Sequence, residues 1–179
     1  FDPNDKDLSL YQVISGTKKI SEVIKKSESP NLDLIQSSID LVGIEIELVD
    51  EEEREYKLRE KINDIKNLYD FILIDCAPSL GLITLNALTS SNSVLIPIQC
   101  EYFALEGLGK LLNTIKSVQK IHNENLDIEG ILLTMFDSRL RLSNQVVEEV
   151  RKHFGDIVFD TIIQRNIKLG EAPGFGKDI

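Results

Sequence analysis

Short runs of almost continuously apolar residues recur along the chain, at 71–75, 94–98, 130–136 and, more weakly, 157–163. Runs of this length that are apolar on both faces are typical of strands covered by helices on either side. Segments with helical spacing separate them, at about 82–90, 103–122 and 141–154. This alternation indicates right-handed crossovers and a mainly parallel sheet. We therefore predict a three-layer α/β fold with helices on both faces of the sheet.

The N-terminal part has shorter and less regular patterns. Residues 8–14 and 19–26 suggest two short helices, and 31–36 alternates polar and apolar residues as a strand with one covered face does. From 38 to 68 the apolar spacing becomes helical, with a nearly all-charged stretch at 50–55. We interpret that stretch as a solvated helix face; an acidic docking surface is the alternative.

Composition places the chain among ordinary soluble proteins. Its 179 residues are 42% hydrophobic and 28% charged, which suits one domain, with no apolar run long enough to span a membrane. The N-terminus does not resemble a signal peptide, and two cysteines are too few for a disulfide framework, so we expect a cytoplasmic protein.

The net charge of −10 argues against general affinity for nucleic acid, but the charge is unevenly distributed. Residues 1–137 carry 13 Lys and Arg against 24 Asp and Glu, whereas residues 138–179 carry 7 against 6. A local DNA-facing patch in the last quarter of the chain is therefore compatible with the composition.

Polar residues that directly follow the apolar runs are the candidates for chemistry, because ligands of parallel sheets bind beyond the carboxyl ends of the strands. Asp75 ends the first run and is suited to hold a cation against a phosphate, although it would also suit a turn cap. The restrained turn after it, with Pro78, Ser79 and Gly81, begins a helix and is suited to an anion or a switch loop.

The later strand ends carry further candidates. Asp137 and Asn166 have side chains that could read the edges of a bound base, and both are also common turn residues. The basic character of this region comes from Arg139, Arg141, Arg165 and Lys168. Phosphate contact and a solvated surface are about equally good interpretations of these four.

Taken together, these segments resemble the ParA/Soj family of chromosome- and plasmid-partitioning ATPases, in the deviant-Walker group with MinD. The matching segments cover nearly the whole chain and are YDFILIDCAPSLG (69–81), LNAL (85–88), VLIPIQCEYFALEG (94–107), GILLTMFD (130–137) and IQRNIKLGEAP (163–173). The resemblance implies two subunits that sandwich ATP and Mg²⁺. The ATP-bound homodimer would bind double-stranded DNA without sequence preference, and a ParB/Spo0J-like protein would stimulate hydrolysis near the bacterial nucleoid.

The resemblance also implies roles for individual residues. Asp75 corresponds to the catalytic Walker B carboxylate that orients magnesium through water, and 75–81 corresponds to the second switch. The positions that contact adenine correspond to Met135, Asp137 and Asn166. The regions implicated in DNA binding contain Arg139, Arg141, Arg165 and Lys168.

Two small departures from the family pattern are Gln164 in place of proline and Gly174 in place of serine. A larger one is that no glycine-rich phosphate loop of the type KGGVGKT occurs in these residues. We therefore expect 1–179 to be one α/β ATPase domain, incomplete at the N-terminus and at the C-terminus, that is inactive alone. Loss of a central strand should leave two neighbouring strands without a partner and apolar surface exposed.

Two other functions fit the same residues. One is a catalytically dead remnant that keeps a dimerisation or partner-binding surface, which the coding sequence upstream of Phe1 would distinguish. The other is a MinD-like ATPase that acts at the membrane through an amphipathic C-terminal helix. The segments EYFALEG and RNIKL fit the partitioning branch better, and no membrane partner is predicted.

Overall fold

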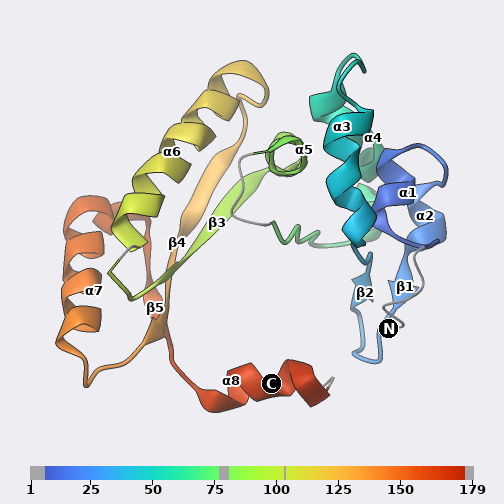
Figure 1. Cartoon of the computed structure of the whole chain (residues 1–179). Helices are drawn as coiled ribbons and strands as arrows, with labels where there is room; N and C mark the ends of the chain where they lie inside the picture. The colour runs from blue at the N-terminus through green and yellow to red at the C-terminus, as the bar shows by residue number, and fades with distance from the viewer. Residues whose placement is uncertain (1–6, 77–80, 103, 176–179) are drawn as a thin grey trace. The chain divides into compact units, whose positions relative to one another are not determined.

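The chain divides into Phe1–Ser91 (unit 1) and Asn92–Ile179 (unit 2). The computed structural model describes residues 7–76, 81–102 and 104–175 (Figure 1). That 1–179 form a single domain stays a prediction.

Unit 2 is built on a parallel sheet with the order β3-β4-β5. Its strands are β3 (Ser93–Gln99), β4 (Asp127–Phe136) and β5 (Val158–Gln164). The connections are α6 (Ala104–Ile121), α7 (Arg141–Phe154) and the short η4 (Gly155–Ile157), and α8 (Ile167–Glu171) and η5 (Ala172–Phe175) follow β5. The strands predicted at 94–98, 130–136 and 157–163 are confirmed, as are the two long helices between them.

One face of this sheet carries the core of unit 2. Ile96 and Ile98 of β3 and Ile131 and Leu133 of β4 are buried there. α6 packs on β3, α7 packs on β5, and the two helices contact each other, so both cover the same face (Figure 1). The alternation along β3 leaves Leu95 on the opposite face, half exposed.

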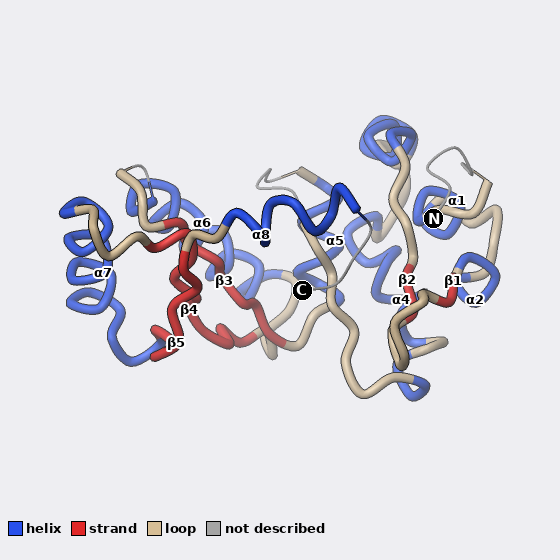
Figure 2. Tube along the Cα trace, turned by 90° about the horizontal axis from the view of Figure 1, so that it is seen from below, coloured by secondary structure: helices blue, strands red, loops and turns tan. Residues whose placement is uncertain are grey.

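Unit 1 consists of short helices around two small apolar clusters, with one two-residue strand pair (Figure 2). The chain order is α1 (Leu10–Ile14), α2 (Ile20–Val23), β1 (Lys25–Lys26), β2 (Asp33–Leu34), η1 (Ile39–Gly43), α3 (Ile44–Glu47), η2 (Arg54–Tyr56), α4 (Lys57–Asn63), η3 (Lys66–Leu68) and α5 (Leu82–Ser90). The helix predicted at 82–90 is confirmed. The helical spacing at 38–68 corresponds to several short helices instead of one long one.

The prediction of a strand at 71–75 is wrong for the structure described. These residues form no strand ladder, and the side chains of Phe71 and Leu73 are 85% and 93% exposed. An apolar run becomes a strand only where a neighbour accepts and donates its backbone hydrogen bonds, and no described segment pairs with this one.

One edge of the sheet in unit 2 also has no neighbouring strand among the described residues. Within the part of the chain that the structure describes, β3 pairs only with β4, so its other edge has no ladder. The expected loss of a central strand stays a prediction. Among the described residues, no helix is both long and apolar enough to cross a membrane.

Candidate functional site

The carboxyl ends of β3, β4 and β5 meet along one edge of the sheet in unit 2, because the three strands are parallel. Two backbone bonds join the residues just beyond β3 and β5 to the end of β4: Cys100 N–H donates to the Thr134 carbonyl (2.9 Å), and Arg165 N–H donates to the Phe136 carbonyl (2.9 Å). This edge therefore brings together the chain that follows each strand, including Asp137 and Asn166.

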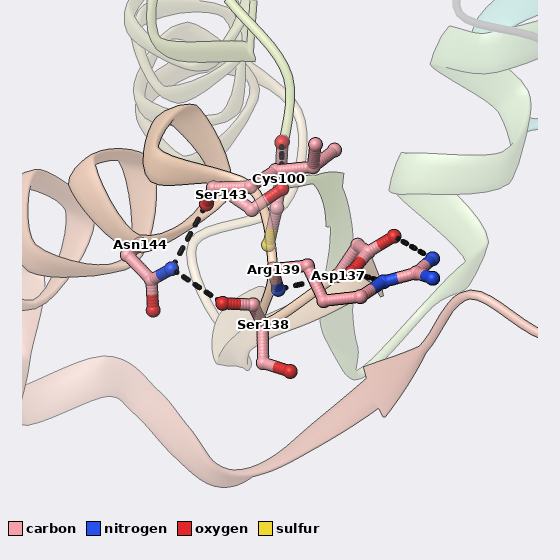
Figure 3. Close-up of polar contacts among 7 residues, drawn as sticks. Cys100, Asp137, Ser138, Arg139, Ser143 and Asn144 are labelled. Atoms are coloured by element: carbon pink, nitrogen blue, oxygen red, sulfur yellow. Dashed lines mark hydrogen bonds and ion pairs between the residues drawn. The ribbon is translucent and has the colours of Figure 1, made fainter.

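Asp137 anchors the turn that follows β4. Its Oδ1 accepts from the Arg139 N–H (3.0 Å) and Nε (2.9 Å), and its Oδ2 accepts from Arg139 Nη2 (2.7 Å) (Figure 3). These hydrogen bonds from Arg139, aided by the positive charge of Arg165, lower the pKa of Asp137 to about 2. The carboxylate is therefore ionised at neutral pH, and the guanidinium is held in one orientation.

The start of α7 holds this turn in place. Asn144 Nδ2 donates to the carbonyls of Ser138 (3.1 Å; Figure 3) and Leu140 (2.9 Å). The buried Ser143 hydroxyl donates to the Cys100 carbonyl (3.2 Å) and so ties α7 to the chain after β3. The turn that carries Asp137 and Arg139 is thus held by α7, and α7 is in turn held by the chain that follows β3.

Met135 and Asn166 occupy unusual backbone positions at the same edge. Met135 has a φ of 54°, at an irregularity in the register between β4 and β5, and its side chain is 36% exposed. Asn166 is the N-cap of α8, where its Oδ1 accepts from the Lys168 N–H (3.0 Å). The amide nitrogen of Asn166 has no acceptor among the described residues and remains a donor at the exposed edge.

Arg165 is paired with an acid that our sequence reasoning did not single out. Its Nη2 donates to Glu101 Oε1 at 3.1 Å, which joins the ends of β5 and β3 across the sheet edge. Both side chains are about half exposed. Glu101 follows β3 as Asp137 follows β4, so the rule that selected the other strand ends could have found it.

The other two predicted basic residues are less constrained. Arg141 begins α7, Lys168 lies in α8, and both are exposed. Neither forms an ion pair with any residue that the structure describes. The edge therefore has two arginines held by acids, Arg139 and Arg165, and two cations without such a partner among the described residues.

The remaining predicted residues belong to unit 1. Asp75 is exposed after the apolar run 71–75, and no group of three or more metal-binding side chains is found in the described part of the chain. A cation at Asp75 would take its other ligands from water and phosphate, which is the usual arrangement for Mg²⁺. One exposed carboxylate is compatible with that role.

The predicted switch is described only in part. Pro78 and Ser79 lie outside the described residues, whereas Gly81 is the N-cap of α5. The Glu45 carboxylate lies against Gly81, and the Ile83 N–H donates weakly to Glu45 Oε1 (3.5 Å). Glu45 therefore places a negative charge at the positive end of this helix, and no motif in the sequence singles it out.

Comparisons with known proteins give a consistent result. Residues 1–128 match the model of a family described as an AAA domain. The sporulation initiation inhibitor protein Soj of Bacillus subtilis is 51% identical over 175 residues, which are 98% of this chain and 69% of that protein. The chromosome-partitioning ATPase Soj of Treponema pallidum is 51% identical over 172 residues, 96% of this chain and 68% of the relative.

Two solved structures of other proteins have folds similar to that of this chain. A cobyrinic acid a,c-diamide synthase from Mycobacterium smegmatis, with bound ADP and magnesium, superposes with a TM-score of 0.85 at 35% identity. The match covers 93% of this chain and 68% of that one. A plasmid partition protein from Borrelia burgdorferi has a TM-score of 0.76 at 26% identity, over 89% and 65% of the two chains. The predicted class of α/β fold, a parallel sheet with helical layers, is confirmed.

Proposed function

The chain belongs to the Soj/ParA family of partitioning ATPases, and from that premise we propose that it forms most of an ATPase that segregates DNA. The observation that carries the proposal is the identity to the two Soj proteins over almost the whole chain. The polar residues at the carboxyl edge of the sheet support it, because this edge is where ligands of such folds bind.

The adenine of ATP would lie against Met135, Asp137 and Asn166. Arg139 supplies three of the hydrogen bonds that the Asp137 carboxylate accepts, which leaves about one lone-pair position for a base amino group. The Asn166 amide nitrogen would donate to a ring nitrogen, while its oxygen keeps α8 capped. The exposed Met135 thioether offers an apolar surface for the ring.

Magnesium would be held through water by Asp75, and the metal would neutralise phosphate charge when bound. Gly81 and the switch residues Pro78 and Ser79 would couple the phosphate state to a dimer surface. The 179 residues contain no glycine-rich phosphate loop, and we propose that a segment preceding Phe1 in the source protein supplies it. Residues 1–179 alone should then bind ATP weakly and should not hydrolyse it.

DNA would contact the basic residues of unit 2. Arg141 and Lys168 would be available to phosphates directly, whereas Arg139 and Arg165 are held by Asp137 and Glu101. The ATP-bound protein would act as a homodimer on the nucleoid in the cytoplasm, and a ParB-like protein would stimulate hydrolysis. No membrane partner is part of this proposal.

The test uses the full-length source protein with ATP and Mg²⁺. Arg139→Glu and Arg165→Glu should each lower affinity for random-sequence double-stranded DNA by at least about tenfold and reduce its dependence on salt. Binding of a fluorescent ATP analogue should not change in Arg165→Glu, whereas Arg139→Glu also removes hydrogen bonds that orient Asp137 and should weaken it. Arg59→Glu makes the same change of charge at an exposed position of unit 1 and serves as the matched control.

Glu101→Gln provides a second arm of this experiment. It releases Arg165 from its ion pair, so DNA should bind more tightly than to the unmodified protein. Equal, salt-sensitive DNA affinity in both arginine variants and in the Arg59→Glu control would overturn the DNA assignment. Absence of ATP binding by the full-length protein would instead favour the partner-binding remnant.

A further inference from the structure

The Asp137 carboxylate is almost fully used by hydrogen bonds within its own turn. Its Oδ1 accepts from the Arg139 N–H (3.0 Å) and from Arg139 Nε (2.9 Å), and its Oδ2 accepts from Arg139 Nη2 (2.7 Å; Figure 3). A carboxylate oxygen has about two lone-pair positions. Oδ1 is therefore saturated, and one position, on Oδ2, has no donor among the described residues.

This remaining position acts as an acceptor and not as a donor. The hydrogen bonds from Arg139 lower the pKa of Asp137 to about 2, so the carboxylate carries no proton at neutral pH. The Asp137 side chain is 15% exposed, whereas that of Arg139 is 86% exposed. A ligand at this edge therefore meets a single, narrow acceptor.

Asn166 supplies a donor at the neighbouring strand end. The Arg165 N–H donates to the Phe136 carbonyl at 2.9 Å, and Asn166 and Asp137 directly follow these two residues. The Asn166 Oδ1 accepts from the Lys168 N–H at 3.0 Å, which fixes the orientation of the amide. The amide nitrogen is thus held as a donor, next to the acceptor on Asp137.

One donor beside one acceptor complements adenine better than guanine. In adenine the N6 amino group donates, and the ring nitrogen next to it accepts. Guanine has two neighbouring donors, N1–H and the N2 amino group, which together need two acceptor positions. With Oδ1 saturated, one of these donors would lose its water without gaining a partner, and an unpaired polar group is costly to a complex.

We propose that Arg139 is a specificity-determining residue of the nucleotide site. By occupying three of the roughly four acceptor positions of Asp137, it limits the carboxylate to one donor of the base and makes the site select adenine over guanine nucleotides. The inference rests on the proposed function, which places the base against Asp137 and Asn166. Arg139 is a positioning residue in this role, because it acts on the base through Asp137.

The test measures base selectivity in the full-length source protein with Mg²⁺. ATP, GTP and ITP compete with a fluorescent ATP analogue that is labelled on the ribose, which leaves the base unchanged. The hypoxanthine base of ITP has the N1–H of guanine but lacks the N2 amino group. The unmodified protein should bind ATP at least about tenfold more tightly than GTP.

Arg139→Ala removes the guanidinium but keeps the backbone N–H that donates to Oδ1, so each carboxylate oxygen regains an acceptor position. The preference for ATP over GTP should fall by at least about tenfold, because guanine gains a second hydrogen bond to a charged acceptor. ITP has no second donor and should not share this gain. Arg151→Ala removes an exposed arginine from α7 and is the matched control, with all affinity ratios unchanged.

Asp137→Asn provides a second arm with a different expected pattern. Arg139 should keep the amide oxygen of the new side chain, which turns the remaining acceptor into a donor. GTP and ITP both have an O6 carbonyl that accepts such a bond, so both should gain relative to ATP.

The same ratio of ATP to GTP affinity in Arg139→Ala and in Arg151→Ala would overturn this inference and leave the proposed function intact. Equal gains of GTP and ITP in Arg139→Ala would also overturn it, since the N2 amino group would then not be read. A folding defect in Arg139→Ala would lower all three affinities by the same factor, so the ratios still decide. Failure of the unmodified protein to bind any of the three nucleotides would overturn the proposed function and this inference with it.

Discussion

The segment at 71–75 and strand β3 are both continuous apolar runs, but their side chains have different surroundings. In β3, Ile96 and Ile98 are 3% and 5% exposed, and the backbone pairs with β4 along its length. At 71–75, Phe71 and Leu73 are almost fully exposed, and no ladder forms. An apolar run is thus converted into a buried strand only where a paired backbone and a covering helix are both present.

The two units also differ in the interactions that hold their helices and strands together. Unit 2 is held by strand ladders and by the helices that cover one face of the sheet. Unit 1 relies on side chains that bond to the backbone of neighbouring elements. The buried Asn86 of α5 accepts from the Leu58 N–H (3.0 Å) and donates to the Arg54 carbonyl (2.8 Å), and the Thr89 hydroxyl donates to the Glu55 carbonyl (2.6 Å).

The largest effect that would test this comparison is expected from Leu133→Ala in β4. Leu133 is fully buried, so its truncation should lower the free energy of unfolding by about 3 kcal/mol, through lost burial and the cavity left behind. Leu73→Ala removes the same atoms from an exposed side chain and should change the free energy of unfolding by less than about 0.5 kcal/mol. Urea unfolding followed by circular dichroism measures both, and equal losses would mean that 71–75 is covered in solution.

A smaller effect is expected from Asn86→Ala in unit 1. Loss of the amide leaves the Leu58 N–H and the Arg54 carbonyl without this partner, at a cost of about 2 kcal/mol. Asn63→Ala, at an exposed position of α4, is the control and should cost less than about 0.5 kcal/mol. The same unfolding experiment applies; similar values for the two variants would show that Asn86 does not join the elements of unit 1.

The smallest effect concerns the turn after β4 and depends on pH. The folded state lowers the pKa of Asp137 from 3.8 to about 2, so the carboxylate stabilises the protein above about pH 4 and loses this contribution as the pH falls toward 2. Asp137→Asn should therefore reduce the loss of stability between about pH 4 and about pH 2.

Urea midpoints at the two pH values measure this difference. Glu124→Gln removes one negative charge from another exposed position of unit 2 and should leave the pH dependence unchanged. The same pH dependence in Asp137→Asn and in the unmodified chain would contradict the assignment.

Much of unit 2 could be predicted from the sequence because its elements depend on local pattern. The runs that became β3, β4 and β5 and the periodicity that became α6 and α7 are continuous, and the strand-end rule identified Asp137 and Asn166. The ion pair of Arg165 with Glu101 could not be predicted, since it joins residues 64 positions apart whose approach depends on strand order. The same holds for Glu45 beside Gly81, which are separated by 36 positions of sequence.

The sequence by itself determined the α/β class and the residues at the strand ends, because hydrophobic periodicity and turn chemistry are local properties of the chain. It indicated the family through the resemblance of its motifs. Only the tertiary structure decided which apolar runs are strands and which apolar residues remain at the surface. The run at 71–75 is suited to burial, and so are Ile39, Val42, Ile46 and Val49, yet Phe71, Leu73 and these four are exposed in the structure described. Burial requires a partner surface, and a pattern along one segment does not specify where its partner lies.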